Sequence, residues 1–159
     1  MTSARNVNAA PIGAAFTFLA LVTGSLWGRP MWGTYWEWDA RLTSVLILFL
    51  MYLGLIALWR AVEDPSRAAR AAAILTLVGA INLPIIKFSV DWWNTLHQQA
   101  SVMRIGGPTL DRAFLMPLLV MAVAFSLLFV TLHIAAMRNE ILRRRVRALQ
   151  MLQASQQAA

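Results

Sequence analysis

The sequence contains no cysteine and little charge. Of its 159 residues 13% are charged, and a single lysine stands among 14 basic residues. Without cysteine the chain has no disulfide, no thiolate metal site and no Cys-x-x-Cys-His motif for covalent haem attachment. Soluble domains carry about 25% charged residues, whereas this sequence is 59% hydrophobic. The composition therefore predicts an integral membrane protein.

Long charge-free runs divide the chain. A helix needs about 20 apolar residues to cross the hydrocarbon core of a bilayer. We expect an all-α, polytopic membrane protein whose four transmembrane helices cover residues 11–27, 42–59, 71–90 and 113–137. The connection 62–67 contains Pro65, which we expect to end the preceding helix. The first run continues into a tryptophan-rich segment without a small-residue cleavage site, which favours a membrane span over a cleaved signal peptide.

The basic residues are divided unequally between the two sides of this topology. Nine lie at the N-terminus, in the second connection and in the tail, and five lie in the other two connections. The positive-inside rule then places both termini in the cytoplasm, an N-in/C-in orientation. Residues 139–159 form a basic cytoplasmic tail, and the segments 28–41 and 91–112 share the outer face. The lipid bilayer thus explains the net charge of +7, and we expect no nucleic-acid partner.

Four of the seven tryptophans fall within twelve residues, between the first two predicted spans. Crowded rings of this kind serve either as interfacial anchors or as a platform for a large planar ligand that carries carboxylates. Their density favours the platform. Asp39 either orients an arginine or caps the next helix, and Arg29 and Arg41 either pair with ligand carboxylates or anchor the chain. The rings proposed for the platform are those of Trp32, Trp36 and Trp38.

The connection after the third predicted span carries a second aromatic group. Trp92 and Trp93 precede His97, which is one of only two histidines. Taken by itself, a histidine in a loop is usually solvated. The other histidine, His133, lies some twenty residues into the fourth span, about 30 Å below its outer end at about 1.5 Å per residue. We therefore expect His133 to be a packing residue near the inner face.

These two regions resemble the motifs of a known family. The first region reads Trp32-Gly33-Thr34-Tyr35-Trp36-Glu37-Trp38-Asp39. It resembles the tryptophan-rich (WWD) motif of haem-handling membrane proteins of c-type cytochrome assembly. The continuation Ala40-Arg41-Leu42-Thr43-Ser44 resembles the haem exporter protein C (CcmC) branch rather than the cytochrome c synthase branches, which continue with a proline. The second region is similar to the same branch and reads Asn82-Leu83-Pro84-Ile85-Ile86, then Trp92-Trp93-Asn94-Thr95-Leu96-His97-Gln98.

The resemblance implies a function that the residues alone leave open. It implies that His97 is an axial ligand of haem (heme b) iron. It also implies an inner-membrane protein that presents haem to a periplasmic haem chaperone, beside ABC-transporter subunits of the cytochrome c maturation system. The family's chains carry two further helices, with a second outer-face histidine, before the point where this sequence starts. Either the true start lies upstream, or the chain is a degenerate or truncated member of the family. The other implied haem-site residues are Trp32, Trp36, Trp38, Asp39, Arg41, Trp92 and Trp93.

The sequence shows no paired nucleophile and base and no phosphate-binding loop. We therefore expect a haem-binding and transfer protein rather than an enzyme. The alternative is a structural or interaction subunit of a membrane complex, in which the tryptophan-rich loop is an interfacial anchor. Haem binding distinguishes the two hypotheses.

Overall fold

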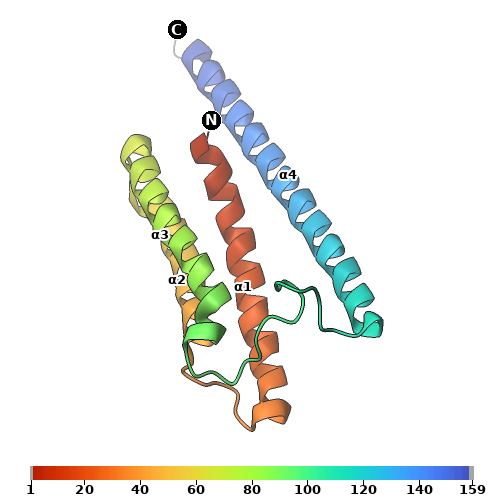
Figure 1. The fold of residues 1–159 in the computed structure, drawn as a ribbon. Coiled ribbons are helices and arrows are strands. Elements are labelled where there is room, and N and C mark those ends of the chain that lie inside the picture. Colours follow the sequence, from red (N-terminus) through yellow and green to blue (C-terminus); the bar gives the residue numbers. More distant parts are fainter. Residues whose placement is uncertain (1, 158–159) are drawn as a thin grey trace.

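The computed structural model describes residues 2–157, with side chains from residue 9 onward. Within this range it consists of four helices and no strand (Figure 1). All four are long and apolar enough to cross a membrane, and each contains one of the predicted spans. The prediction of an all-α membrane protein with four spans is therefore confirmed. The helices are α1 (Thr2–Trp32), α2 (Ala40–Ala61), α3 (Pro65–Trp92) and α4 (Arg112–Gln157).

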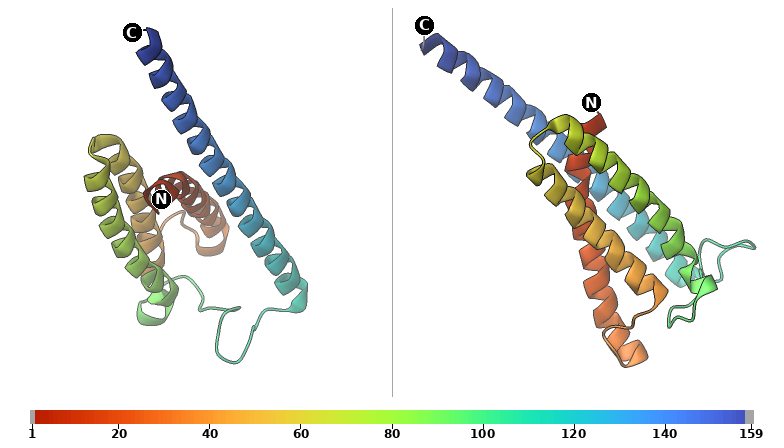
Figure 2. Two further views of the ribbon diagram at one scale, coloured as in Figure 1. Left: turned by 90° about the horizontal axis from the view of Figure 1, so that it is seen from above. Right: turned by 90° about the vertical axis from the view of Figure 1, so that its left-hand side faces the viewer.

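The helices form a group of three with a fourth helix at its side (Figures 1 and 2). α2 packs against both α1 and α3, and α4 contacts α1. The connections 33–39 and 93–111 lie at one end of the bundle, and the short connection 62–64 lies at the opposite end (Figure 1). We call the end of the bundle formed by residues 33–39 and 93–111 the aromatic end. Two predicted site segments that are far apart in the sequence therefore meet in space.

Small residues allow α1, α2 and α3 to approach one another closely. Ala10, Leu55 and Ala72, one from each helix, form a buried cluster. At Gly13 an added Cβ would lie 2.6 Å from the ring of Tyr52, so a larger residue would require that ring or the helices to shift. Small residues are common at helix crossings in membranes, where close packing replaces the hydrophobic driving force between helices.

Most large apolar side chains point away from the bundle. α4 has no buried residue along its described length, and its exposed side chains include Leu118, Val123 and Leu127. An apolar surface of this extent is unfavourable in water, but in a bilayer it faces hydrocarbon. The outer surface of the structure thus supports the membrane location predicted from composition.

α2 and α3 are also joined by a buried polar contact. Nδ2 of Asn82 donates a hydrogen bond to the backbone carbonyl oxygen of Ser44 at 2.8 Å, and both residues are buried. Hydrogen bonds between membrane helices contribute about 0.6 kcal/mol on average. The contact therefore adds little stability, and its main effect is to fix how α3 is aligned along α2.

The structure corrects the role predicted for Pro65. α2 ends at Ala61, before the proline, and Pro65 is the first residue of α3, with Asp64 as the N-cap. Proline is favourable at the first helical position because its missing amide hydrogen would have no intrahelical acceptor there. α1 extends to Trp32, so the first part of the tryptophan-rich segment is helical. α4 continues without interruption from the predicted fourth span into the basic tail.

Candidate functional site

Asp39 connects the two parts of the aromatic end. Its backbone is extended, with φ −88° and ψ 166°, and it is the N-cap of α2. Oδ1 accepts a hydrogen bond from the amide of Leu42 at 2.7 Å. An aspartate at this position satisfies one of the amides that the start of a helix leaves unpaired. Of the two roles considered for Asp39, the structure shows the N-cap.

The second carboxylate oxygen of Asp39 contacts the connection 93–111. Oδ2 accepts a hydrogen bond from the hydroxyl of Thr95 and lies 2.7 Å from Nδ1 of His97. The hydroxyl oxygen of Thr95 in turn accepts a hydrogen bond from the backbone amide of His97 at 3.1 Å. One carboxylate therefore joins the start of α2 to side chains that are 56 and 58 residues away in the sequence.

Asp39 remains ionised although it is only 3% exposed. Burial by itself raises the pKa of a carboxyl group, because it penalises the charged form. Here the hydrogen bonds from Thr95, from the amide of Leu42 and from His97 outweigh burial and lower the pKa of Asp39 below its ordinary value of 3.8. At neutral pH Asp39 is a carboxylate, which accepts hydrogen bonds and donates none.

The imidazole of His97 is held on two sides. Nδ1 faces the Asp39 carboxylate, and the ring packs edge-on against Trp32, with centroids 4.6 Å apart and planes at 66°. In the part of the chain that the structure describes, every hydrogen bond of the ring involves Nδ1. Because the carboxylate only accepts, Nδ1 carries the proton, and whenever the ring is neutral Nε2 therefore keeps its lone pair. The ring can therefore act as a nitrogen ligand through Nε2.

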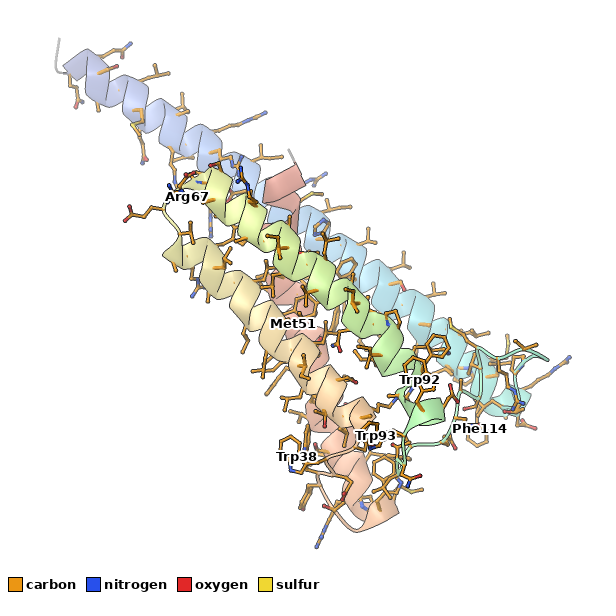
Figure 3. All side chains as sticks on the ribbon, turned by 60° about the vertical axis from the view of Figure 1, so that its left-hand side comes forward. Trp38, Met51, Arg67, Trp92, Trp93 and Phe114 are labelled. Carbon is orange, nitrogen blue, oxygen red and sulfur yellow. The ribbon has the colours of Figure 1, made fainter. Side chains whose placement is uncertain are left out.

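The tryptophans of the first motif form edge-to-face pairs rather than one flat surface. Trp27 meets Trp32 with centroids 5.3 Å apart, and Trp36 meets Trp38 at 5.4 Å. Trp36 is half-buried, whereas Trp38 is 72% exposed and projects from the bundle (Figure 3). Edge-to-face contacts restrict the orientation of both rings. Of the three motif tryptophans, Trp32 is the one in ring contact with His97.

One of the two arginines near the motif is already engaged. Nη1 of Arg29 donates a hydrogen bond to the carbonyl oxygen of Gly33 at 2.6 Å, and its guanidinium lies 5.3 Å from the centre of the Tyr35 ring. Arg29 thereby satisfies a carbonyl just beyond the end of α1. Arg41 is half-buried in the first turn of α2, and its guanidinium has no carboxylate partner among the described side chains. Arg41 is therefore the cation better placed to meet a ligand carboxylate.

Trp92 and Trp93 lie at the end of α3 (Figure 3). Trp92 is the last residue of the helix and stacks on Phe88 with centroids 5.7 Å apart, and Trp93 is the C-cap. Both rings are about two-thirds exposed, at 68% and 67%. The structure thus places Trp93 in the aromatic end and Trp92 at the adjoining end of α3, but the ring that contacts His97 is Trp32.

The other histidine belongs to a different part of the molecule. His133 lies in α4 and stacks parallel on Phe129, with ring centroids 5.8 Å apart. Its Nδ1 is buried and has no hydrogen-bond partner among the described residues. α4 begins at Arg112, so His133 is about 30 Å along the helix from the aromatic end at about 1.5 Å per residue.

Sequence reasoning missed the role of Thr95 and the contact between Asp39 and His97. Neither residue type nor spacing indicates this pairing, because it depends on how α2 packs against α3. The signal that the sequence does contain is chemical. A carboxylate, a hydroxyl and an imidazole occur in two connections that the topology predicts to share one face.

Comparison with known proteins identifies the family. A sequence model described as Heme exporter protein C matches residues 1–152. The chain is 88% identical over 150 residues to Heme exporter protein C of Bradyrhizobium diazoefficiens, an alignment that covers 94% of this chain and 57% of that protein. It is 57% identical over 133 residues to the Escherichia coli protein of the same name, covering 84% and 53%. For the Haemophilus influenzae protein the identity is 52% over 134 residues, covering 84% and 54%.

The chain spans between 53% and 57% of the length of these three relatives. With bacterial relatives and four helices able to cross a bilayer, it is a multi-pass protein of the bacterial inner membrane. Because the family model covers nearly the whole sequence, this chain belongs to the heme exporter protein C family.

Proposed function

We propose that the aromatic end binds haem b on the periplasmic side of the membrane, with His97 as an axial ligand of the iron. The observation that carries this proposal is the 2.7 Å contact between Nδ1 of His97 and Asp39, which leaves the lone pair of Nε2 available. Metal-binding histidines almost always donate their other ring N–H to a carboxylate, a carbonyl or a water. The name shared by the relatives, Heme exporter protein C, supports haem as the ligand.

The described residues fit one face of a haem. Haem supplies an iron with axial positions above and below a large apolar ring that carries two propionates. His97 offers one axial nitrogen, the motif tryptophans offer apolar contact, and Arg41 offers charge for a propionate. Among the described residues no group of three metal-ligating side chains occurs. His97 would therefore hold the iron as a single imidazole ligand rather than as part of a cluster of metal-ligating side chains.

We further propose that the chain presents this haem to a periplasmic haem chaperone, in a complex with ABC-transporter subunits of the cytochrome c maturation system. In this role the chain is a binding and transfer protein rather than an enzyme. Family membership supports the proposal. The exposure of the site supports it as well, since Trp38 is 72% exposed at the end of the bundle. A partner can therefore reach a ligand held there without entering the bundle.

The periplasmic placement rests on the distribution of basic residues. The aromatic end and its flanking helix ends carry five of them, and the opposite side of the topology carries nine, including four arginines between residues 143 and 147. The side richer in arginine and lysine faces the cytoplasm under the positive-inside rule. We accordingly propose that the basic part of α4 beyond residue 138 is cytoplasmic.

A haem titration followed by visible absorption tests the proposed function. The protein is purified in detergent without haem, and ferric haem is added to the parent and to the double variant Trp36→Ala, Trp38→Ala. We expect a Soret shift in the parent and a loss of affinity in the double variant at unchanged folding. Each ring removes about 0.5–1.5 kcal/mol of aromatic contact in addition to its buried area.

Phe114→Ala provides the matched control. Phe114 is 69% exposed at the start of α4 and lies toward the same end of the molecule (Figure 3). Its replacement should leave haem affinity unchanged. A double variant that binds haem as the parent does would contradict haem contact by these rings and would favour the interfacial anchor.

A further inference from the structure

Resting on the proposed haem function, we propose that Asp39 and Thr95 are positioning residues for the iron ligand. Together they hold His97 with its proton on Nδ1 and the lone pair of Nε2 directed to the haem. Neither residue need touch the haem to do so. Their effect is to fix the tautomer, the orientation and the basicity of the imidazole before haem arrives.

Helix capping alone does not explain the contacts of Asp39. An N-cap needs one side-chain oxygen, and Oδ1 fulfils this role by accepting the amide of Leu42 at 2.7 Å. Oδ2 accepts from Thr95 and faces Nδ1 of His97 at 2.7 Å, although neither partner belongs to α2. Oδ2 therefore binds the connection 93–111 and takes no part in capping α2.

Thr95 extends the same arrangement. Its hydroxyl donates to Oδ2 of Asp39 and accepts from the backbone amide of His97 at 3.1 Å. This single oxygen thus orients the carboxylate and fixes the backbone from which the imidazole projects. With Trp32 against the ring at 4.6 Å, the position of Nε2 is determined by three groups, the Asp39 carboxylate, the Thr95 hydroxyl and the Trp32 ring.

An asparagine at position 39 separates capping from positioning. Asparagine is as good an N-cap as aspartate, so its carbonyl oxygen can keep the bond from the amide of Leu42. Its amide nitrogen then replaces Oδ2 opposite His97 and donates instead of accepting. The imidazole of His97 then accepts this hydrogen bond at Nδ1 and carries its proton on Nε2. Loss of a carboxylate partner in this way leaves the geometry intact but selects the wrong tautomer, and Nε2 no longer has a free lone pair.

The first measurement needs no haem. Nitrogen-15 NMR of histidine-labelled protein in detergent distinguishes a protonated ring nitrogen from an unprotonated one, and His133→Gln removes the signals of the second histidine. We expect the parent to carry the His97 proton on Nδ1. Asp39→Asn should move the proton to Nε2, whereas Glu37→Gln should not. Glu37 is an exposed carboxylate in the same connection, so the control removes the same charge without touching the ring.

The second measurement is the affinity of the same proteins for ferric haem. Loss of a partner that orients a metal ligand typically costs 10- to 100-fold in affinity, so we expect a decrease of about 10- to 100-fold for Asp39→Asn. Glu37→Gln should bind as the parent does. Thr95→Val, which removes the hydroxyl at nearly constant volume, should weaken binding by about tenfold or less. Thr95→Ser keeps the hydroxyl and should restore the parental affinity.

Failure of the positioning role is distinguishable from failure of the proposed function. If the parent carries the His97 proton on Nε2, or if Asp39→Asn binds haem as tightly as Glu37→Gln, the positioning role is wrong. The proposed function survives that result if His97→Ala still abolishes binding. If His97→Ala binds haem as the parent does, His97 is not the iron ligand, and the positioning role fails together with the proposal on which it rests.

Discussion

An aspartate is the N-cap of a helix at each end of the bundle, but the two aspartates have different roles. Asp39 and Asp64 both precede a helix in extended conformation and both accept hydrogen bonds from amides of the first turn. Asp64 bonds to the amide of Ser66 at 2.7 Å, and its other oxygen lies 3.5 Å from Nε of exposed Arg67. Asp39 is buried, and its other oxygen contacts Thr95 and His97 of a different connection.

The difference shows which contacts of Asp39 go beyond local structure. A helix start is capped at Asp64 without burial and with partners only two or three residues away, so burial is no requirement of the cap. At Asp39 the same cap is enclosed, and the carboxylate joins two long connections. The short connection 62–64 requires no such contact, because it joins α2 directly to α3 (Figure 1). Asp39 thus combines a local role with a role in the candidate site.

The largest expected effect is an all-or-none difference between these two ends. Single cysteines introduced at Ser66, beside Asp64, and at Thr109, in the connection 93–111, should react with a membrane-impermeant thiol reagent from opposite sides. The cysteine at position 109 should be accessible from the periplasm, because the arginine-rich side faces the cytoplasm. The cysteine-free sequence provides the background. Labelling of both positions from one side would break the proposed topology.

Replacing each aspartate by alanine should distinguish a cap with an additional role in the candidate site from a cap alone. The two variants should differ in their loss of unfolding free energy and of haem binding. Asp39→Ala leaves the partly buried donors of Leu42, Thr95 and His97 without their acceptor, and a fully buried group left in this way costs about 1–3 kcal/mol. We expect a loss of about 3 kcal/mol in unfolding free energy together with loss of haem binding. Asp64→Ala should cost less and leave haem binding intact, because its cap is exposed to water. Thermal unfolding in detergent measures the first effect and a haem titration the second. Equal losses for the two variants would contradict the comparison.

A smaller effect is expected at Gly33, which directly follows the last residue of α1 and lies within the tryptophan-rich motif. Gly33 has φ +79°, a left-handed conformation that costs other residues about 1–2 kcal/mol. Gly33→Ala should therefore destabilise the protein by about 1 kcal/mol. Gly24 in α1 has open space where a Cβ would be added, so Gly24→Ala should be neutral or slightly stabilising. Thermal unfolding of both variants measures the difference, and the prediction is wrong if both shift in the same direction by the same amount.

The smallest expected effect is a pH dependence of the Asp39 contribution. Hydrogen bonds that outweigh burial lower the pKa of Asp39 below its ordinary 3.8. A lowered pKa means that the ionised carboxylate stabilises the folded state above about pH 3.8, and that this contribution is lost as pH falls through the lower, folded-state value. The difference in unfolding temperature between parent and Asp39→Ala should stay constant above that pH and shrink below it. A difference that grows on acidification would contradict the assigned sign.

Much of the fold could be predicted from the sequence, because a membrane span requires a long apolar run and few alternatives share that pattern. The four spans and the cap at Asp39 follow from such local rules. Pro65 was assigned to the wrong helix, since a proline in a connection is compatible with either the end of one helix or the start of the next. Local patterns distinguish these two only when the N-cap is recognised, and here Asp64 is that residue.

The candidate site could be predicted in composition but not in arrangement. The resemblance pointed to Asp39, His97 and the motif tryptophans, and the structure brings Asp39, His97 and Trp32 together. It could not show that Trp36 and Trp38 form a pair of their own, or that Thr95 bonds to Asp39. The contact between Thr95 and Asp39 depends on tertiary packing between segments 56 residues apart, for which a single sequence carries no periodic signal. The pairing of Trp36 with Trp38 depends on the backbone conformation of their connection, which residue type alone does not fix.

The two histidines provide the most direct test that His97 is the iron ligand. Ferric haem is titrated into the parent, His97→Ala and His133→Ala, and the visible absorption spectra are compared. Loss of the ligand itself should exceed the roughly 100-fold upper range for loss of an orienting partner, so His97→Ala should lose nearly all binding. His133→Ala should match the parent. We expect added imidazole to convert the parent to a six-coordinate, low-spin form, because His97 is the one histidine in the connections 33–39 and 93–111. A His97→Ala protein with the parental spectrum and affinity would contradict the assignment.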